Sequence, residues 1–226
     1  MIDELLRREF NRWADLGRGR GMEKNHWEVT RQLIEMMNID EHDNVADLGC
    51  GVGWATRVLA QKASRGFVLG IDLSDRMIAQ ARGEYRNPRN ALFLVADAAK
   101  IPCAEGLFHS LLSVESIYFY PDVEGAFSEV QRILRPEAKA FFLINYYKEN
   151  VHGHNWAKFI DIPVHLLGAD DYTALLSKVG FRAASHRRVI NSTPIPEDWK
   201  PTPWFPTKQD QAKFQAEGAL LLTAEK

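Results

Sequence analysis

The stretch Val45-Ala46-Asp47-Leu48-Gly49-Cys50-Gly51-Val52-Gly53-Trp54 decides the fold of this chain. Its first residues form a short apolar run that ends in alternate glycines, and Trp54, Val58 and Leu59 then fall on one face of a helix. The pattern predicts a strand, a tight turn and a helix. Glycines let the backbone approach a ligand closely, and the helix start offers free N–H groups and a positive dipole end, which suits a carboxylate or a phosphate. A tight turn needs glycine even without a ligand, so whether this turn binds one has to be judged from other residues.

Strands and helices alternate through the rest of the chain. We expect strands at 67–71, 92–95, 107–114 and 140–145, helices at 77–85, 123–134 and 170–179, and two last strands at 181–189 and 218–224. Asp122 is the expected N-cap of the second of these helices, and Asp170 or Asp171 that of the third. Such alternation predicts parallel strands joined by helical crossovers, and therefore an α/β fold.

The 226 residues suit one domain with a substantial core, covering 1–226. We expect residues 1–27 to form a helical lid with a glycine-rich break at 17–21. Residues 148–168 and 193–208 are expected to be insertions on the substrate side of the sheet. The second of these is rich in proline and tryptophan, and proline interrupts helices and strands alike.

The composition disfavours several classes of protein. The formal net charge is -2, so no global field attracts nucleic acid, although the stretch 12–24 holds four cations. Cys50 and Cys103 are too few for a disulfide framework and lack the spacing of a zinc site. No apolar run reaches the length of a membrane span, and the first residues are charged. We expect a cytoplasmic monomer or homodimer that works without nucleic acid or membrane.

Two further carboxylates follow predicted strands. Asp72 comes at the end of the second strand, about twenty residues after the glycine turn, where a carboxylate can accept both hydroxyls of a ribose. Asp97 follows the third strand, and the pair Asp97-Ala98 could read an adenine edge with a side-chain oxygen and a backbone N–H. Each aspartate could instead cap a turn. Together with the glycine turn, in this order and spacing, they indicate an adenosine ligand.

From about Glu28 to its end the chain resembles the class I S-adenosylmethionine-dependent methyltransferases. The family's first motif, acid-x-glycine-x-glycine-x-glycine, is matched by Asp47, Gly49, Gly51 and Gly53. A nicotinamide-binding turn would have glycine where this chain has Trp54, which disfavours a dehydrogenase. The resemblance implies a Rossmann-like, mostly parallel sheet of seven strands with an antiparallel last strand and helices on both faces. The chain looks most like the ubiquinone and menaquinone biosynthesis type.

The resemblance also implies roles for single residues. Gly49 and Gly51 would pass the methionine moiety, Asp72 would bind the ribose, and Asp97 with Ala98 would recognise the adenine amino edge. The adenine would lie between Leu73 and Met77, while Ser113 and Glu115 would lie near the methionine part and the acceptor. The chain departs from the family pattern at Glu137-Ala138, where a glycine pair is usual, and at His109, where an acid is common.

The expected reaction is an in-line transfer of the methyl group of S-adenosylmethionine to a small-molecule acceptor, leaving S-adenosylhomocysteine. It chiefly needs alignment and exclusion of water, with no metal ion. A phenol, alcohol or carbon acid would also need a general base, for which the candidates are His154, His26, Glu115 and His152. Two other functions stay open. One is a sensor or partner subunit that binds the cofactor without turnover, and the other is a methyltransferase acting on RNA or protein.

Overall fold

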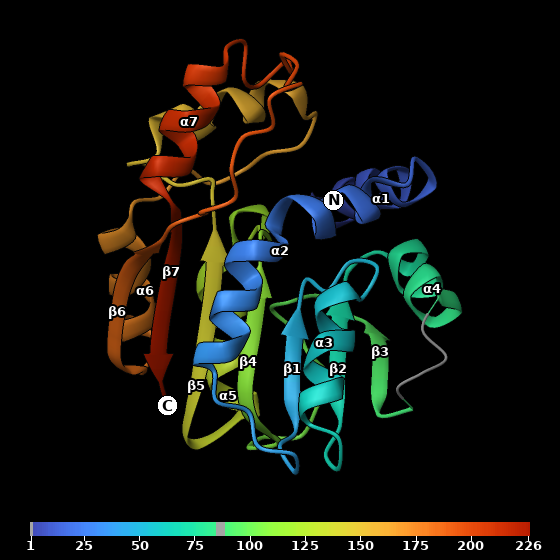
Figure 1. Ribbon diagram of the computed structural model, residues 1–226. Helices are drawn as coiled ribbons and strands as arrows, with labels where there is room; N and C mark the ends of the chain where they lie inside the picture. The colour runs from blue at the N-terminus through green and yellow to red at the C-terminus, as the bar shows by residue number, and fades with distance from the viewer. Residues whose placement is uncertain (1, 85–88) are drawn as a thin grey trace.

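A computed structural model describes residues 2–84 and 89–226 of the chain. A seven-stranded sheet has the order β3-β2-β1-β4-β5-β7-β6 (Figure 1). Its strands are β1 (Val45–Leu48), β2 (Val68–Asp72), β3 (Ala91–Val95), β4 (Phe108–Val114), β5 (Leu134–Ile144), β6 (Arg182–Val189) and β7 (Ala219–Glu225). The helices are α1 (Ile2–Asp15), α2 (Arg18–Met36), α3 (Trp54–Lys62), α4 (Asp75–Glu84), α5 (Val123–Ile133), α6 (Ala169–Lys178) and α7 (Lys208–Glu217), with 3-10 turns η1 (Ile117–Phe119) and η2 (Val151–Phe159).

Helices cover both faces of the sheet, as the sequence predicts. On one face α2 and α3 pack through Leu33 and Leu59 against Leu112 and Leu221. On the other face Phe127 of α5 packs on Phe142 of β5, and α6 adds the buried Tyr172. Strand β1, which is buried along its whole length, and the largely buried β4 therefore lie in the middle of a three-layer core.

The direction of the last strand confirms the predicted fold class. Strands β1 to β5 pair in parallel, whereas β7 is antiparallel to both of its neighbours, β5 and β6. Residue pairs such as Phe142 with Leu222 are buried on both strands, because helices cover the two faces there. The chain thus has the Rossmann-like α/β fold with an antiparallel seventh strand.

Several boundaries differ from the sequence-based expectation. The break in the N-terminal helices is confined to Leu16 and Gly17, the latter at φ 69°, and α2 already starts at Arg18 with Gly19 and Gly21 inside it. Strand β5 begins at Leu134 instead of 140, because Pro136 lies where the register to β4 shifts and its missing N–H costs no ladder bond. Helix α7 lies within a stretch for which no helix is expected. The predicted end of the 77–85 helix, Tyr85, lies outside the described residues.

The carboxyl ends of the parallel strands meet at one edge of the sheet, and three segments gather over that edge. Figure 1 shows α1 and the start of α2 on one side, with η2 and α7 on the other. Helix α1 is fixed to α4 because Asn11 accepts a hydrogen bond from the Ser74 hydroxyl at 2.6 Å and donates one to Asp75 at 2.9 Å. Helix α7 packs on η2. These segments place side chains from distant parts of the sequence above the strand ends.

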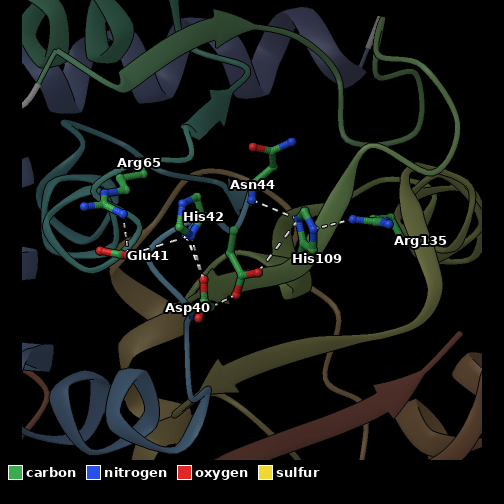
Figure 2. A network of polar contacts seen from close by, with 8 residues as sticks. Asp40, Glu41, His42, Asn44, Arg65, His109 and Arg135 are labelled. Atoms are coloured by element: carbon green, nitrogen blue, oxygen red, sulfur yellow. Dashed lines mark hydrogen bonds and ion pairs between the residues drawn. The ribbon is translucent and has the colours of Figure 1, made fainter.

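A polar network holds the opposite edge of the sheet (Figure 2). The ring of His109, at the start of β4, accepts a hydrogen bond from the backbone N–H of Asn44 at 2.9 Å and contacts Arg135 through its other nitrogen. Glu41 forms an ion pair with Arg65 at 3.0 Å. His109 therefore joins the loop before β1 to the start of β5, at a position where the resembling family commonly has an acid.

Candidate active site

The glycine turn between β1 and α3 has the conformation that its sequence predicts. Gly49, Gly51 and Gly53 have φ values of 75°, 53° and 78°, in the left-handed region where side chains with a Cβ are strained. A Cβ at Gly49 would lie 2.4 Å from Cβ of Ser116, and one at Gly53 would lie 2.5 Å from the ring of Phe93. A Cβ at Gly51 would meet no atom within 4 Å. Gly51 therefore leaves open space next to the start of α3, whereas the other two permit close packing.

Asp72 organises this turn from the end of β2. One carboxylate oxygen accepts the backbone N–H of Gly51 at 2.8 Å, and the other accepts that of Ser74 at 2.8 Å. Burial raises the pKa of Asp72, and these backbone hydrogen bonds oppose the rise. Each oxygen keeps a second lone pair that can accept a hydroxyl. The carboxylate is thus held in place in a way that suits a ribose.

Asp47 is a buried carboxylate in the middle of the first motif. It accepts the hydroxyl of Thr56 at 2.6 Å, which joins β1 to the first turn of α3. Burial raises the pKa of Asp47 to about 7, against the opposing effect of the Thr56 hydrogen bond, and the nearby charge of Asp72 adds to the rise. A cation bound beside the turn would favour the ionised form of this carboxylate.

A single cavity of about 920 Å³ runs from the glycine turn to the segments above the sheet edge. Its lining includes most of the residues to which the resemblance gives a role, namely Asp47, Gly49, Gly51, Asp72, Leu73, Met77, Asp97, Ala98, Glu115 and His26. Gly53 and Ser113 are not among the lining residues. Ser113 lies behind the wall, where its hydroxyl is 2.6 Å from that of Ser116. Asp97 caps its own turn by accepting the N–H of Ala99 at 2.9 Å.

Glu115 lies where this cavity passes from the strand ends to the upper segments. Its φ of 54° is unusual for a residue with a side chain, and its carboxylate is buried. Tyr118 donates its hydroxyl to one oxygen at 2.9 Å, and Asn145 donates its amide N–H to the other at 2.8 Å. In the described part of the chain no lysine or arginine pairs with Glu115. A carboxylate that no lysine or arginine of the described chain neutralises therefore faces the cavity.

The three histidine candidates for the general base have different surroundings. Nδ1 of His26, on α2, lies 3.5 Å from Glu115 and 3.4 Å from the Asn145 amide nitrogen, and His26 lines the cavity. Nε2 of His154, in η2, lies 3.0 Å from the backbone oxygen of Tyr147, and His154 is not among the lining residues. The structure thus brings His26 and Glu115 together in the cavity lining, whereas His154 lies outside that lining. His152, also in η2, is not among the lining residues either.

Aromatic side chains form the upper part of the cavity. They come from η1, the end of β5, η2, the stretch before α7 and α7 itself, and comprise Tyr118, Phe119, Tyr146, Trp156, Phe159, Trp204, Phe205 and Phe214. Trp156 contacts the rings of Tyr118 and Tyr146 at centroid distances of 5.6 and 5.5 Å, and Phe159 contacts Trp204 at 6.3 Å. Both predicted insertions therefore contribute to one apolar chamber above Glu115.

Sequence reasoning missed two groups of this site. Asn145 and Ser116, whose hydroxyl lies 2.8 Å from that of Tyr120 beneath Gly49, are not among the predicted site residues. The position of Asn145 at the end of the expected strand 140–145 was a usable signal, because strand ends meet at one edge. The contacts of Ser116 depend on tertiary packing and have no signal in the local sequence.

Known methyltransferases resemble this chain in sequence. Residues 46–142 match the family model described as a methyltransferase domain. The chain is 28% identical over 182 residues to the methyltransferase GfsG of Streptomyces halstedii, covering 77% of this chain and 63% of that protein. It is 26% identical over 202 residues to the O-methyltransferase cnsE of Penicillium expansum, covering 84% of this chain and 68% of that protein.

A solved structure is more similar over the whole chain. It is the complex between the Haloferax volcanii Trm112 methyltransferase activator and a protein described as "the putative methyltransferase", with 30% identity, a TM-score of 0.88, and coverage of 96% of this chain and 97% of that one. Together with the family match, this likeness shows that the chain belongs to the S-adenosylmethionine-dependent methyltransferases. The cofactor of the family is S-adenosylmethionine, for which the glycine turn and the strand-end carboxylates provide the expected groups.

Proposed function

We propose that the protein transfers a methyl group from S-adenosylmethionine to a small molecule bound in the aromatic chamber above Glu115. The observation that carries the proposal is the continuity of the cavity, which holds the cofactor residues at one end and the aromatic chamber at the other. A macromolecular acceptor would have to reach Glu115 past α1, η2 and the stretch before α7. None of the described helices is long and apolar enough to cross a bilayer.

The donor set of the site fits the cofactor. Asp72 has free lone pairs for two ribose hydroxyls, Gly51 leaves open space for the methionine part, and Leu73 with Met77 gives apolar walls for the adenine. The bound cofactor supplies a methyl group on an electron-poor sulfur.

The residues around Glu115 then act on the acceptor. Glu115 accepts a hydrogen bond from the acceptor atom and orients its lone pair, while Tyr118 and Asn145 hold the carboxylate. His26 lies next to Glu115 and can pass a proton towards the outside. The aromatic walls exclude water from the reacting groups.

Calorimetric titration with S-adenosylmethionine and S-adenosylhomocysteine, followed by an acceptor screen that detects the demethylated product, tests this proposal. We expect micromolar binding of both and turnover on a small acceptor. Binding without turnover on any small acceptor would favour a sensor or a macromolecular methyltransferase. The absence of binding by either compound would contradict the proposal altogether.

We further propose that the protein works with an activator of the kind seen with its Haloferax volcanii relative. The support lies at β3, the edge strand of the sheet, which among the described strands pairs with β2 alone. Its Leu92 and Val95 are 49% and 40% exposed. An unpaired apolar edge strand is a template for the strand of a partner, and proteins without such a partner usually protect it.

Co-expression with Haloferax volcanii Trm112 and size-exclusion chromatography tests this assembly. We expect the two chains to co-elute and the double substitution Leu92→Lys and Val95→Lys to separate them. Ile190→Lys is the matched control, because Ile190 is 47% exposed at a distance from β3 along the sheet. Failure to co-elute, or co-elution that survives the double substitution, would contradict the proposal.

A further inference from the structure

The charges that line the cavity are mostly negative. Among the described lining residues, the carboxylates are Asp3, Asp47, Asp72, Asp97 and Glu115, and the only guanidinium is that of Arg18. The guanidinium of Arg18 lies 5.0 Å from the centre of the Trp13 ring and already makes a cation–π contact there. The cofactor is a net cation and offsets part of this negative charge. An acceptor carrying a phosphate or carboxylate would find few cationic partners here.

The aromatic chamber provides walls but few polar partners. The polar side chains that line its upper part are the uncharged Asn191, Thr202, Gln211 and Gln215. Aromatic faces are electron-rich and attract cations and the N–H groups of weakly basic molecules. Glu115 is therefore the charged anchor of the chamber, at its lower end.

The hydrogen bonds at Glu115 indicate what it can still bind. Each of its oxygens already accepts one hydrogen bond from a neutral donor, Tyr118 on one side and Asn145 on the other. Each oxygen keeps one further lone pair, so the acceptor has to present a hydrogen-bond donor on the atom that faces Glu115. A nitrogen that carries an N–H meets this requirement and still has a lone pair for the methyl group.

We propose that the acceptor is an amine on an apolar, ring-bearing body, and that Glu115 is the residue that selects it. This inference rests on the proposed methyl transfer. The amine lone pair forms the N–C bond as the S–C bond breaks, and the electron pair of that bond stays on sulfur. Before this attack the bound ammonium ion gives one proton to Glu115, which passes it on to His26, and the methylated product leaves as an ammonium ion. The Penicillium expansum relative is named for transfer to oxygen, so the comparison of amine with alcohol is decisive.

The test compares three ligands with the same ring. Protein saturated with S-adenosylhomocysteine is titrated calorimetrically with phenethylamine, phenethyl alcohol and hydrocinnamate. We expect the amine to bind about 10-fold or more tightly than the alcohol, and the carboxylate to bind most weakly, because the amine binds as an ammonium ion that pairs with the charge of Glu115, whereas the alcohol is neutral and the carboxylate is repelled. In Glu115→Gln the preference for the amine over the alcohol should fall below about threefold. Glu124→Gln, at an exposed glutamate on α5, is the matched control and should keep it.

Each other outcome has a separate meaning. Tight binding of hydrocinnamate, an equal affinity for amine and alcohol, or no binding of the amine would overturn the inference. A preference that persists in Glu115→Gln would remove Glu115 from selection. The ligand series on the unsubstituted protein stands even if the variant fails to fold. If the unsubstituted protein does not bind S-adenosylhomocysteine at all, the result would instead contradict the proposed function.

Discussion

Asp72 already accepts backbone N–H groups on both oxygens, so its removal affects the turn as well as the ligand. We predict that Asp72→Ala weakens S-adenosylmethionine binding by roughly 2 to 4 kcal/mol, about 30- to 1000-fold, because two charge-assisted hydrogen bonds to the ribose are lost. Calorimetric titration measures the change. Asp170→Ala, at a carboxylate 97% exposed on α6, should bind like the unsubstituted protein. An unchanged affinity of Asp72→Ala would remove Asp72 from the cofactor site.

His26 and His154 make a matched pair of candidates for the proton acceptor. Because His26 contacts Glu115 in the cavity wall, His26→Ala should lower kcat about 100-fold or more with little change in cofactor affinity. His154 hydrogen bonds to the backbone of Tyr147, so His154→Ala should lower the melting temperature more than kcat. Steady-state kinetics and thermal melts of both variants, on an acceptor found by the screen, measure the two effects. A larger loss of kcat in His154→Ala would identify His154 as the base instead.

For single residues, the sequence predicts the site best where a residue comes at the end of a strand. Gly51, Asp72 and Asp97 follow strands directly, and the carboxyl ends of parallel strands meet, so spacing alone predicts that they share one site. The cluster at Glu115 could not be predicted in the same way. Asn145 shares the strand-end signal, but His26 comes from a helix and Tyr118 from a 3-10 turn, and only the tertiary packing brings these two side chains to Glu115.

At the scale of secondary-structure elements, the pair β1 and α3 contributes both to the stability of the fold and to the cofactor site. Its link is the hydrogen bond from Thr56 to buried Asp47, whose pKa burial raises to about 7. Between about pH 4 and pH 7 the folded protein therefore holds a proton on Asp47 that the unfolded chain has lost. The stability from this proton is present at low pH and is lost as the pH rises through 7.

We predict that Asp47→Asn stabilises the ligand-free protein relative to the unsubstituted one at pH 8 and much less at pH 5. The difference between the two pH values should be up to about 3 kcal/mol, since the folded protein gives up this proton over the two pH units between pH 5 and its pKa of about 7 while the unfolded chain has already lost it. Melting temperatures of both proteins at both pH values, without cofactor, give the comparison. A shift of equal size at pH 5 and pH 8 would show that Asp47 does not titrate in this range.

Elements with a clear apolar pattern were predicted well, and those without one were not. Helix α5 has a strong stripe, and Asp122 caps it by accepting the N–H of Gly125 at 2.8 Å, as expected. Helix α7 has no buried residue and therefore no stripe that could reveal it. Its N-cap, Thr207 with Asp210 three residues later, was the signal that could have identified it.

On the scale of the whole molecule, two distant parts of the chain enclose the cavity. We predict that residues 2–24 and 193–208 exchange backbone hydrogens more slowly when S-adenosylhomocysteine is saturating, because both segments border the cavity and contain glycines or prolines. Hydrogen exchange followed by mass spectrometry measures this, with α5 and α6 as the internal reference. Unchanged exchange in both segments would show that the cofactor leaves them as they are.

The position of β7 between β5 and β6 has a consequence for biosynthesis. Strand β7 is made after both of its neighbours, and among the described strands β6 pairs with no other. A nascent chain that has released β6 but not β7 therefore exposes one free edge on β5 and leaves β6 without a ladder. The largely apolar sequence Ala219–Glu225 closes both gaps at once. The sheet is completed in a single late step, and until then the open edge of β5 can pair with another chain.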